Sequence, residues 1–345
     1  MRRTREPDAG HPLAGARWGE GALGLSTQLN EFELIRRYFS PPTGHTVLAG
    51  GDDAALIAVM PGMELAVSTD VLVAGRHFPD DTEPHDVGYK SMAVNLSDMA
   101  AMGAQPRWAT LSLTLPEADE LWLERFASGF LDLARAYDVD LIGGDTTRGP
   151  LTICVQIMGE VPAGKALRRS GARAGDELWV SGCLGDAALA LACLRGELDL
   201  RGADRAYVLQ RLNQPQPHVV LGQGLLGLAT GAIDVSDGLA ADVGHIAGAS
   251  RVRAAIDWEL VPLSAVAERH RETPLVQRCA LSGGDDYELA FTVPPGVSKQ
   301  LERLATQLEV ALTRIGRIER GSGVSVLDRA GGRINLPEAG FDHFR

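Results

Sequence analysis

The chain has 345 residues, of which 45% are hydrophobic and 23% charged, with a formal net charge of -12. This length suits two domains, and the residue balance excludes a wholly disordered chain. The acidity, with no Lys/Arg-rich block, excludes a nucleic-acid binder, which needs a basic face.

The apolar segments are short. None approaches the roughly 20 residues of a membrane span. No apolar segment follows the N-terminal arginines as a secretory signal requires. We therefore expect a cytoplasmic protein without a membrane partner. The cysteines lie in apolar stretches without a CxxC pair, which predicts buried, reduced thiols: Cys154, Cys183, Cys193 and Cys279.

The first part of the chain predicts an unstructured start followed by alternating strands and helices. Residues 1–28 are rich in Gly, Arg, Ala and Pro without periodicity, so we expect a disordered extension. Apolar periodicity and turn residues then predict these elements in order: a helix over 30–39, strands over 54–60 and 64–68, a helix over 84–102, a strand over 108–115, a helix over 117–137, and strands ending at 145 and spanning 151–161.

The pattern restarts after Pro162-Ala163-Gly164. The expected elements are a strand over 176–181, helices over 186–195 and 203–212, a strand over 232–235, a helix opened by Gly238, a strand over 287–293 and a helix over 299–308. Strands and helices mixed on both sides of residue 163 predict an α/β (α+β) fold with two mixed domains, 29–162 and 163–345.

Six acidic clusters stand out because most lie beside glycines or apolar segments. They are Gly51-Asp52-Asp53, Ser68-Thr69-Asp70, Asn95-Leu96-Ser97-Asp98, Gly143-Gly144-Asp145, Asp234-Val235-Ser236-Asp237-Gly238 and Ser282-Gly283-Gly284-Asp285-Asp286-Tyr287-Glu288. A single Asp-Gly or Gly-Asp pair is typically a turn. Six such clusters instead favour a site for a hard cation, because Mg²⁺ prefers carboxylates, hydroxyls and phosphate oxygens.

Three aspartates are expected at the carboxyl ends of strands, where α/β sheets usually bind ligands: Asp70, Asp145 and Asp234. The chain has no GxxxxGK[ST], no HRD or DFG, no HExxH and no GxSxG. Many aspartates without an activated nucleophile favour phosphoryl transfer from ATP by positioning and charge neutralisation.

At these motifs the chain resembles the thiamine-monophosphate kinase family. That family belongs to a superfamily with aminoimidazole ribonucleotide synthetase, selenophosphate synthetase and the hydrogenase-maturation dehydratase. The resemblance runs from about residue 30 to the end and rests on the segments EFELI, GDDAA, STDVLVAGRHF, AVNLSDMAAMGA, GGDTTRGP and IDVSDGL and on the Gly283-Gly284 cluster. It implies a homodimer joined through the N-terminal sheets, and transfer from ATP to thiamine monophosphate with several Mg²⁺ ions.

The resemblance also implies roles for particular residues. The implied magnesium ligands are Asp53, Ser68, Thr69, Asp70, Asp98, Asp145, Asp234 and Asp237. The implied ATP contacts are Gly144, Asp145, Arg169 and Ser236, and the implied substrate contacts are His77, Asp285 and Phe341. The chain has Asp285 where the family usually has Glu, and its first 28 residues have no family counterpart.

Other functions remain open at this stage. No cysteine precedes Cys154, which argues against selenophosphate synthetase, and the chain ends without the cysteine tail of the hydrogenase-maturation protein. An enzyme resembling aminoimidazole ribonucleotide synthetase is the nearest alternative. A non-catalytic module that binds metal or nucleotide is an alternative of another class.

Overall fold

The computed structural model describes residues 30–336 and 340 of the chain. The predicted extension over 1–28 and Phe341 lie outside these residues. The helices and strands are α1 (Glu31–Tyr38), β1 (Met63–Val73), α2 (Pro84–Met102), β2 (Gln105–Leu115), α3 (Glu120–Ala136), β3 (Asp140–Arg148), β4 (Thr152–Pro162), β5 (Glu177–Ser181), α4 (Asp186–Leu194), α5 (Gly202–Asn213), α6 (Val219–Gly224), β6 (Gly231–Asp234), α7 (Leu239–Ser250), β7 (Arg253–Asp257), α8 (Ala265–Glu268), α9 (Pro274–Ser282), β8 (Leu289–Val293), α10 (Ser298–Leu308), β9 (Leu312–Glu319), β10 (Gly323–Leu327) and β11 (Arg333–Ile334).

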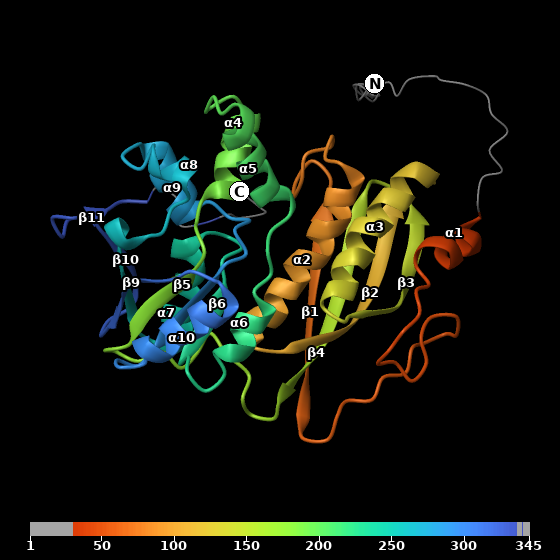
Figure 1. The fold of residues 1–345 in the computed structure, drawn as a ribbon, viewed down its shortest axis with the longest axis horizontal. Coiled ribbons are helices and arrows are strands. Elements are labelled where there is room, and N and C mark those ends of the chain that lie inside the picture. The colour runs from red at the N-terminus through yellow and green to blue at the C-terminus, as the bar shows by residue number, and fades with distance from the viewer. Residues whose placement is uncertain (1–29, 337–339, 341–345) are drawn as a thin grey trace, which may run out of the picture.

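The strands form two mixed sheets, which confirms the predicted α/β class (Figure 1). The first sheet has the order β1-β4-β2-β3, and the second has the order β11-β10-β7-β9-β5-β8-β6. In the first, β2 and β3 are parallel and the other pairs are antiparallel. The largest core cluster contains side chains from both sheets, so the two halves of the chain share buried apolar contacts.

Helices α2 and α3 lie across one face of the first sheet (Figure 1). They cross closely because glycines meet at the contact: a Cβ on Gly88 would lie 2.1 Å from the carbonyl oxygen of Phe126, and one on Gly129 would lie 2.0 Å from that of His85. Helix α2 begins with Pro84 in its first turn and ends at Gly103, whose φ of +66° suits glycine.

The other face of the first sheet is partly open: the loop before β1 covers Trp108 and Met158 there with Ala55 and Ile57, and the rest has no described helix over it. Along β1 the burial alternates: Leu72 is buried, whereas Leu65, Val67 and Val71 are 40%, 53% and 46% exposed. Neighbouring strands add polar and small side chains to this face, including Ser112 and Gln156. The first sheet therefore presents to solvent an apolar strip that α2 and α3 do not cover.

Two predictions about strands were wrong. Residues 54–60 form no strand; they make one isolated bridge, between Leu56 and Leu48. Strand β1 does not end before Asp70 but continues to Val73, because Val71, Leu72 and Val73 keep pairing with β4. Pairing partners far apart in the chain decide such limits, and local sequence does not show them.

Several elements in the second half of the chain were not predicted from the sequence: α6, β7, α8, α9, β9, β10 and β11. The cysteine prediction needs correction as well. All four thiols are free, but only Cys279 is buried, and Cys154, Cys183 and Cys193 are partly exposed. No described helix is long and apolar enough to cross a membrane.

Candidate functional site

Helix α2 supplies one stripe of side chains to the boundary between the two halves of the chain. Its members, spaced by four, three and one residues, are Lys90, Val94, Ser97 and Asp98. The Ser97 hydroxyl donates to Asp234 Oδ2 at 2.8 Å, and Asp98 Oδ2 accepts from the Ser68 hydroxyl at 2.5 Å. The stripe thus links β1 of the first sheet to the end of β6 in the second.

Four carboxylates come together where these elements meet: Asp70, Asp98, Asp234 and Asp237. Burial, together with the charges of Asp98 and Asp237, raises the pKa of Asp70 from its ordinary value of 3.8 to about 7. Burial and the charge of Asp98 likewise raise the pKa of Asp234 to about 8. The pKa of Asp98 is raised by burial, although the Ser68 hydrogen bond and Arg169 oppose the shift.

The loop between β6 and α7 holds this cluster from the second half of the chain. Asp234 is the last residue of β6, as predicted. Asp242, in the first turn of α7, accepts from the backbone N–H groups of Asp237 and Gly238, both at 3.0 Å. Gly284 packs against the loop so tightly that a Cβ there would lie 2.2 Å from the carbonyl oxygen of Ser236. The loop conformation therefore depends on this carboxylate and on a glycine.

The structure does not bring Thr69 and Asp145 to the carboxylate cluster. Asp145 lies inside β3 rather than at its end, so the expectation of a strand-end aspartate was wrong here too. The strand register aligns Asp145 with Ser112, on the open face of the sheet, whereas Asp70 aligns with the buried Val155 on the face that the helices cover. Strands β4 and β2 separate β1 from β3, a span of roughly 14 Å.

Two further glycine-rich segments lie near β3. Gly144 has a φ of +149°, and a Cβ there would lie 1.8 Å from the carbonyl oxygen of Leu111, so only glycine fits beside β2. Asp53 is exposed in the loop before β1. That loop is anchored at this edge, since Gly44 donates to Asp140 and Gly50 approaches Ile142. Asp53 therefore lies on the β3 side of the sheet, away from Asp70.

Arg169 is exposed in the connection between β4 and β5. Its guanidinium is close enough to Asp98 to act on the pKa of that carboxyl. Ser236 lies in the β6–α7 loop, in the wall of the same pocket as Asp70 and Asp237. The sequence-predicted ATP contacts are thus divided: Arg169 and Ser236 lie near the cluster, whereas Gly144 and Asp145 lie at the far edge of the sheet.

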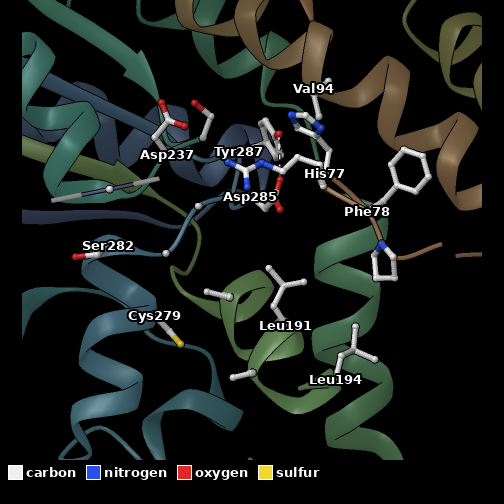
Figure 2. Close-up of a pocket in the computed structure, with 18 of the residues that line it drawn as sticks. His77, Phe78, Val94, Leu191, Leu194, Asp237, Cys279, Ser282, Asp285 and Tyr287 are labelled. Carbon is white, nitrogen blue, oxygen red and sulfur yellow. Dashed lines mark hydrogen bonds between the residues drawn. The ribbon is translucent and has the colours of Figure 1, made fainter. Parts of the chain in front are cut away.

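A pocket of about 1010 Å³ opens between the carboxylate cluster and helices α4 and α9. Asp237, Asp285, Tyr287 and His77 gather at one end of the pocket (Figure 2). Its other end combines apolar side chains such as Leu191, Leu194 and Cys279 (Figure 2) with the charged residues Arg195 and Arg278. The size suits a small organic ligand. Its two ends suit a ligand with a charged end and a ring system.

The sequence-predicted substrate residues His77 and Asp285 both line this pocket. His77 Nδ1 accepts from the Val73 backbone N–H at 3.0 Å, so a neutral ring carries its proton on Nε2. Asp285 Oδ1 lies 3.2 Å from the ammonium nitrogen of Lys90 and accepts from the Tyr287 hydroxyl at 3.2 Å.

A buried ion network lies beneath the Asp285 loop. Glu288 is 2% exposed and accepts from Arg211 at 2.7 Å and from Ser181, and His218 Nε2 lies 2.6 Å from it. Burial disfavours ionisation of Glu288, but the charges and hydrogen bonds of His218 and Arg211 outweigh it and lower its pKa. Glu288 therefore stays ionised and ties the loop to α5.

The donor set fits a hard divalent cation. Within residues 30–336 and 340, no three His, Cys, Asp or Glu side chains converge closely enough to enclose a metal ion by themselves. Mg²⁺ seldom needs such an enclosure, since it is usually held by one or two carboxylates, waters and substrate phosphates. Buried carboxylates with raised pKa values, each next to a hydroxyl, match that pattern: Asp98 with Ser68, and Asp234 with Ser97.

The sequence analysis assigned no role to four residues of this site, although two of them, Ser97 and Tyr287, lie within its acidic clusters: Lys90, Ser97, Asp242 and Tyr287. The first two lie on the stripe of α2 that carries Asp98, at helical spacing. That spacing could have identified them. Asp242 and Tyr287 had no comparable signal, because the folding of their loops sets their contacts.

Comparison with known proteins shows the family to which this chain belongs. Residues 51–161 match the model of the AIR synthase related protein N-terminal domain, and residues 173–329 match that of the C-terminal domain. The chain is 48% identical to a thiamine-monophosphate kinase of Escherichia coli strain K12 over 318 residues, covering 91% of this chain and 98% of that protein. A thiamine-monophosphate kinase of Bacillus subtilis strain 168 is 34% identical over 329 residues, covering 92% of this chain and 100% of that protein.

Solved structures agree with these sequence relatives. A crystal structure of thiamine-monophosphate kinase from Stenotrophomonas maltophilia K279a has a TM-score of 0.78 and 48% identity, covering 82% of this chain and 91% of that one. AaThiL complexed with AMPPCP and TMP has a TM-score of 0.71 and 34% identity, covering 83% of this chain and 89% of that one. Escherichia coli HypE, at 23% identity and a TM-score of 0.71, shares the fold.

Proposed function

The chain belongs to the AIR synthase related family and, within it, to the thiamine-monophosphate kinases, and from this we propose a mechanism in which magnesium ions assist direct phosphoryl transfer from ATP to thiamine monophosphate. One observation supports the cation requirement above the others. Asp70 and Asp237 line the pocket, and Asp98 and Asp234 lie near Asp70. Two phosphate-bearing substrates cannot approach such a cluster without counter-charge.

We assign Asp70, Asp98, Asp234 and Asp237, with the Ser68 hydroxyl, to the binding of Mg²⁺. When bound, the ions would neutralise phosphate charge and help to hold the transferring group. Coulomb's law gives the size of the repulsion between the phosphates: two unit charges 4 Å apart repel by about 4 kcal/mol at an effective dielectric of 20. Burial raises the pKa values of Asp70 and Asp234, and repulsion from neighbouring carboxylates raises them further.

The acceptor needs no general base. A phosphate monoester has a second pKa near 6, so its attacking oxygen is already deprotonated at neutral pH. The chain's task is to orient the acceptor in the pocket, to exclude water, and to hold the two phosphates in line. We assign the pocket residues Asp285 and His77 to the acceptor, and Arg169 and Ser236, which lie near the carboxylates, to ATP.

ADP release tests this proposal. Purified protein with MgATP should release ADP with thiamine monophosphate, and not with thiamine or without an acceptor. Magnesium-dependent stabilisation without any turnover would instead indicate a binding module. With ATP chiral at the γ-phosphorus, a single direct transfer inverts the configuration, so net retention would refute it.

We also propose a homodimer formed through the open face of the first sheet. Leu65, Val67 and Val71 there are about half exposed, which leaves an apolar strip typical of an interface. This arrangement offers an explanation for the separated residues: the side chains of Asp145 and Thr69 lie on that face and Asp53 lies beside it, away from the side that carries Asp70. We propose that they complete the site of the partner subunit.

Subunit mixing tests the shared site. Asp145→Asn and Asp234→Asn homodimers should each be nearly inactive. Mixing and refolding them together should restore part of the activity, because one site of each mixed dimer then carries both intact aspartates. Failure to recover any activity in a mixture shown to contain mixed dimers would contradict the shared site. We also propose that the chain divides into two domains near residue 163 and that the protein is cytoplasmic.

A further inference from the structure

Lys90 is a buried ammonium ion that the proposed reaction does not yet use. The residue is 2% exposed, and its Nζ lies 3.2 Å from Asp285 Oδ1. Within the part of the chain that the structure describes, Nζ has no hydrogen-bond partner. Burying an ammonium ion is expensive unless a charge of opposite sign accompanies it. The only group that offsets this cost among the described contacts is the pocket carboxylate Asp285.

Asp285 is held in place by more than this ion pair. The Tyr287 hydroxyl donates to the same oxygen, Oδ1, at 3.2 Å. Burial, and then the charge of Asp285, raise the pKa of Tyr287 well above its ordinary value, so that hydroxyl keeps its proton. Both contacts are to Oδ1, and no other described residue donates a hydrogen bond to Oδ2, which is available to accept from a ligand in the pocket.

The backbone of this loop is strained in the same place. Asp285 and Tyr287 have φ values of +68° and +52°, in the left-handed region that disfavours residues with a side chain. Such strain costs roughly 1–3 kcal/mol per residue and persists where surrounding contacts hold the chain. Here the backbone N–H groups of Asp285 and Tyr287 donate to the carbonyl oxygens of Ser236 and Val235. The loop is thereby tied to the segment that carries Asp237.

The position of Lys90 relates Asp285 to the carboxylate cluster. Lys90 lies on the same stripe of α2 as Val94, which lines the pocket, and Ser97, which holds Asp234. Both residues belong to one continuous helix, so the Lys90–Asp285 pair and the Ser97–Asp234 hydrogen bond together fix Asp285 relative to the carboxylate cluster. Figure 2 shows Asp285 and Tyr287 together in the pocket wall, with His77 beside them.

We propose that Lys90 is a positioning residue for the acceptor substrate: it acts through Asp285, and with Tyr287 it orients the Asp285 carboxylate toward the acceptor. This inference rests on the proposed function. Lys90 is too buried to contact the acceptor itself, so its effect must pass through the carboxylate.

Steady-state kinetics of the full-length chain separate this role from a general structural one. Lys90→Met should raise KM for thiamine monophosphate about tenfold, because a pocket carboxylate loses its buried partner. KM for ATP should change less than about twofold. Lys90→Arg should recover part of the loss, and Tyr287→Phe should raise the acceptor KM less than Lys90→Met. The matched control is Lys299→Met, an exposed lysine of α10, which should leave both KM values unchanged.

A double-mutant cycle provides the decisive comparison. If Lys90 acts through Asp285, Lys90→Met adds little to the acceptor KM in an Asp285→Asn background. Additive effects of the two substitutions, or equal changes in both KM values, would overturn the inference. If Lys90→Met does not fold, as judged by circular dichroism and thermal unfolding, the same cycle is run with Lys90→Arg in its place. Wild-type protein without acceptor-dependent ADP release refutes the proposed function itself, whereas an active wild type with additive variants refutes this inference alone.

Discussion

Replacing Asp234 by Asn should stabilise the metal-free protein while abolishing its proposed activity. Asp234 is 5% exposed, accepts from the Ser97 hydroxyl at 2.8 Å, and lies near the charges of Asp98 and Asp70. An amide keeps the size and the hydrogen bond with Ser97, because its carbonyl oxygen still accepts. It removes the buried negative charge, which destabilises the fold but is needed for the proposed cation binding.

The magnitude follows from the pKa of Asp234, which is raised from 3.8 to about 8. Such a displacement corresponds to about 5–6 kcal/mol of unfavourable interaction in the ionised form, part of which belongs to the neighbour Asp98. A carboxyl with a raised pKa binds more protons in the folded state than in the unfolded state, so the free energy of unfolding falls as pH rises from about 4 to about 8. We expect Asp234→Asn to recover about 2–4 kcal/mol at pH 8 and almost nothing at pH 4.

Thermal unfolding in excess EDTA between pH 4 and pH 9 measures this effect. At roughly 2 °C per kcal/mol, the variant should unfold about 4–8 °C above wild type at pH 8. Asp132→Asn, on the exposed side of α3, is the matched control and should show no such growth with pH. Added Mg²⁺ should raise the Tm of wild type more than that of Asp234→Asn. A difference between variant and wild type that stays constant across this pH range would refute the reasoning.

Three other outcomes follow from the packing of the chain. Val67→Asp should convert the proposed dimer to a monomer in sedimentation or light-scattering measurements, whereas Val220→Asp, at a similarly exposed valine of α6, should not. Gly129→Ala should destabilise the fold by about 1–3 kcal/mol, because the new Cβ would lie 2.0 Å from the His85 carbonyl oxygen; an unchanged Tm would contradict the close helix crossing. Glu288→Gln should lower the free energy of unfolding by about 3–5 kcal/mol at pH 7. The pKa of Glu288 is lowered in the folded state, so the difference in free energy of unfolding between variant and wild type should shrink as pH falls below about 4.5. Denaturant unfolding at pH 7 and pH 4 measures that difference. A difference that grows on acidification would be inconsistent with an ionised Glu288.

Elements with a strong local signal were predicted well from the sequence. Helix α2 was predicted over 84–102 and spans Pro84–Met102, because proline marks its start, glycine its end, and apolar residues recur between them. The segment over 54–60 looks like a strand locally but has no strand partner beyond one bridge at Leu56. Strand β9 was missed although it pairs with both β5 and β7, since pairing across the sheet, not its own composition, places it there.

The sequence alone determined the chemistry: a set of glycine-flanked aspartates, no activated nucleophile, and motifs of one kinase family. Only the tertiary structure decided which of those aspartates meet. It brings Asp70, Asp98, Asp234 and Asp237 together from two sheets. It also places the side chains of Asp145 and Asp70 on opposite faces of the first sheet. Residue type and spacing specify what a side chain can bind. Strand register and helix packing, set by contacts between distant segments, specify where that side chain points.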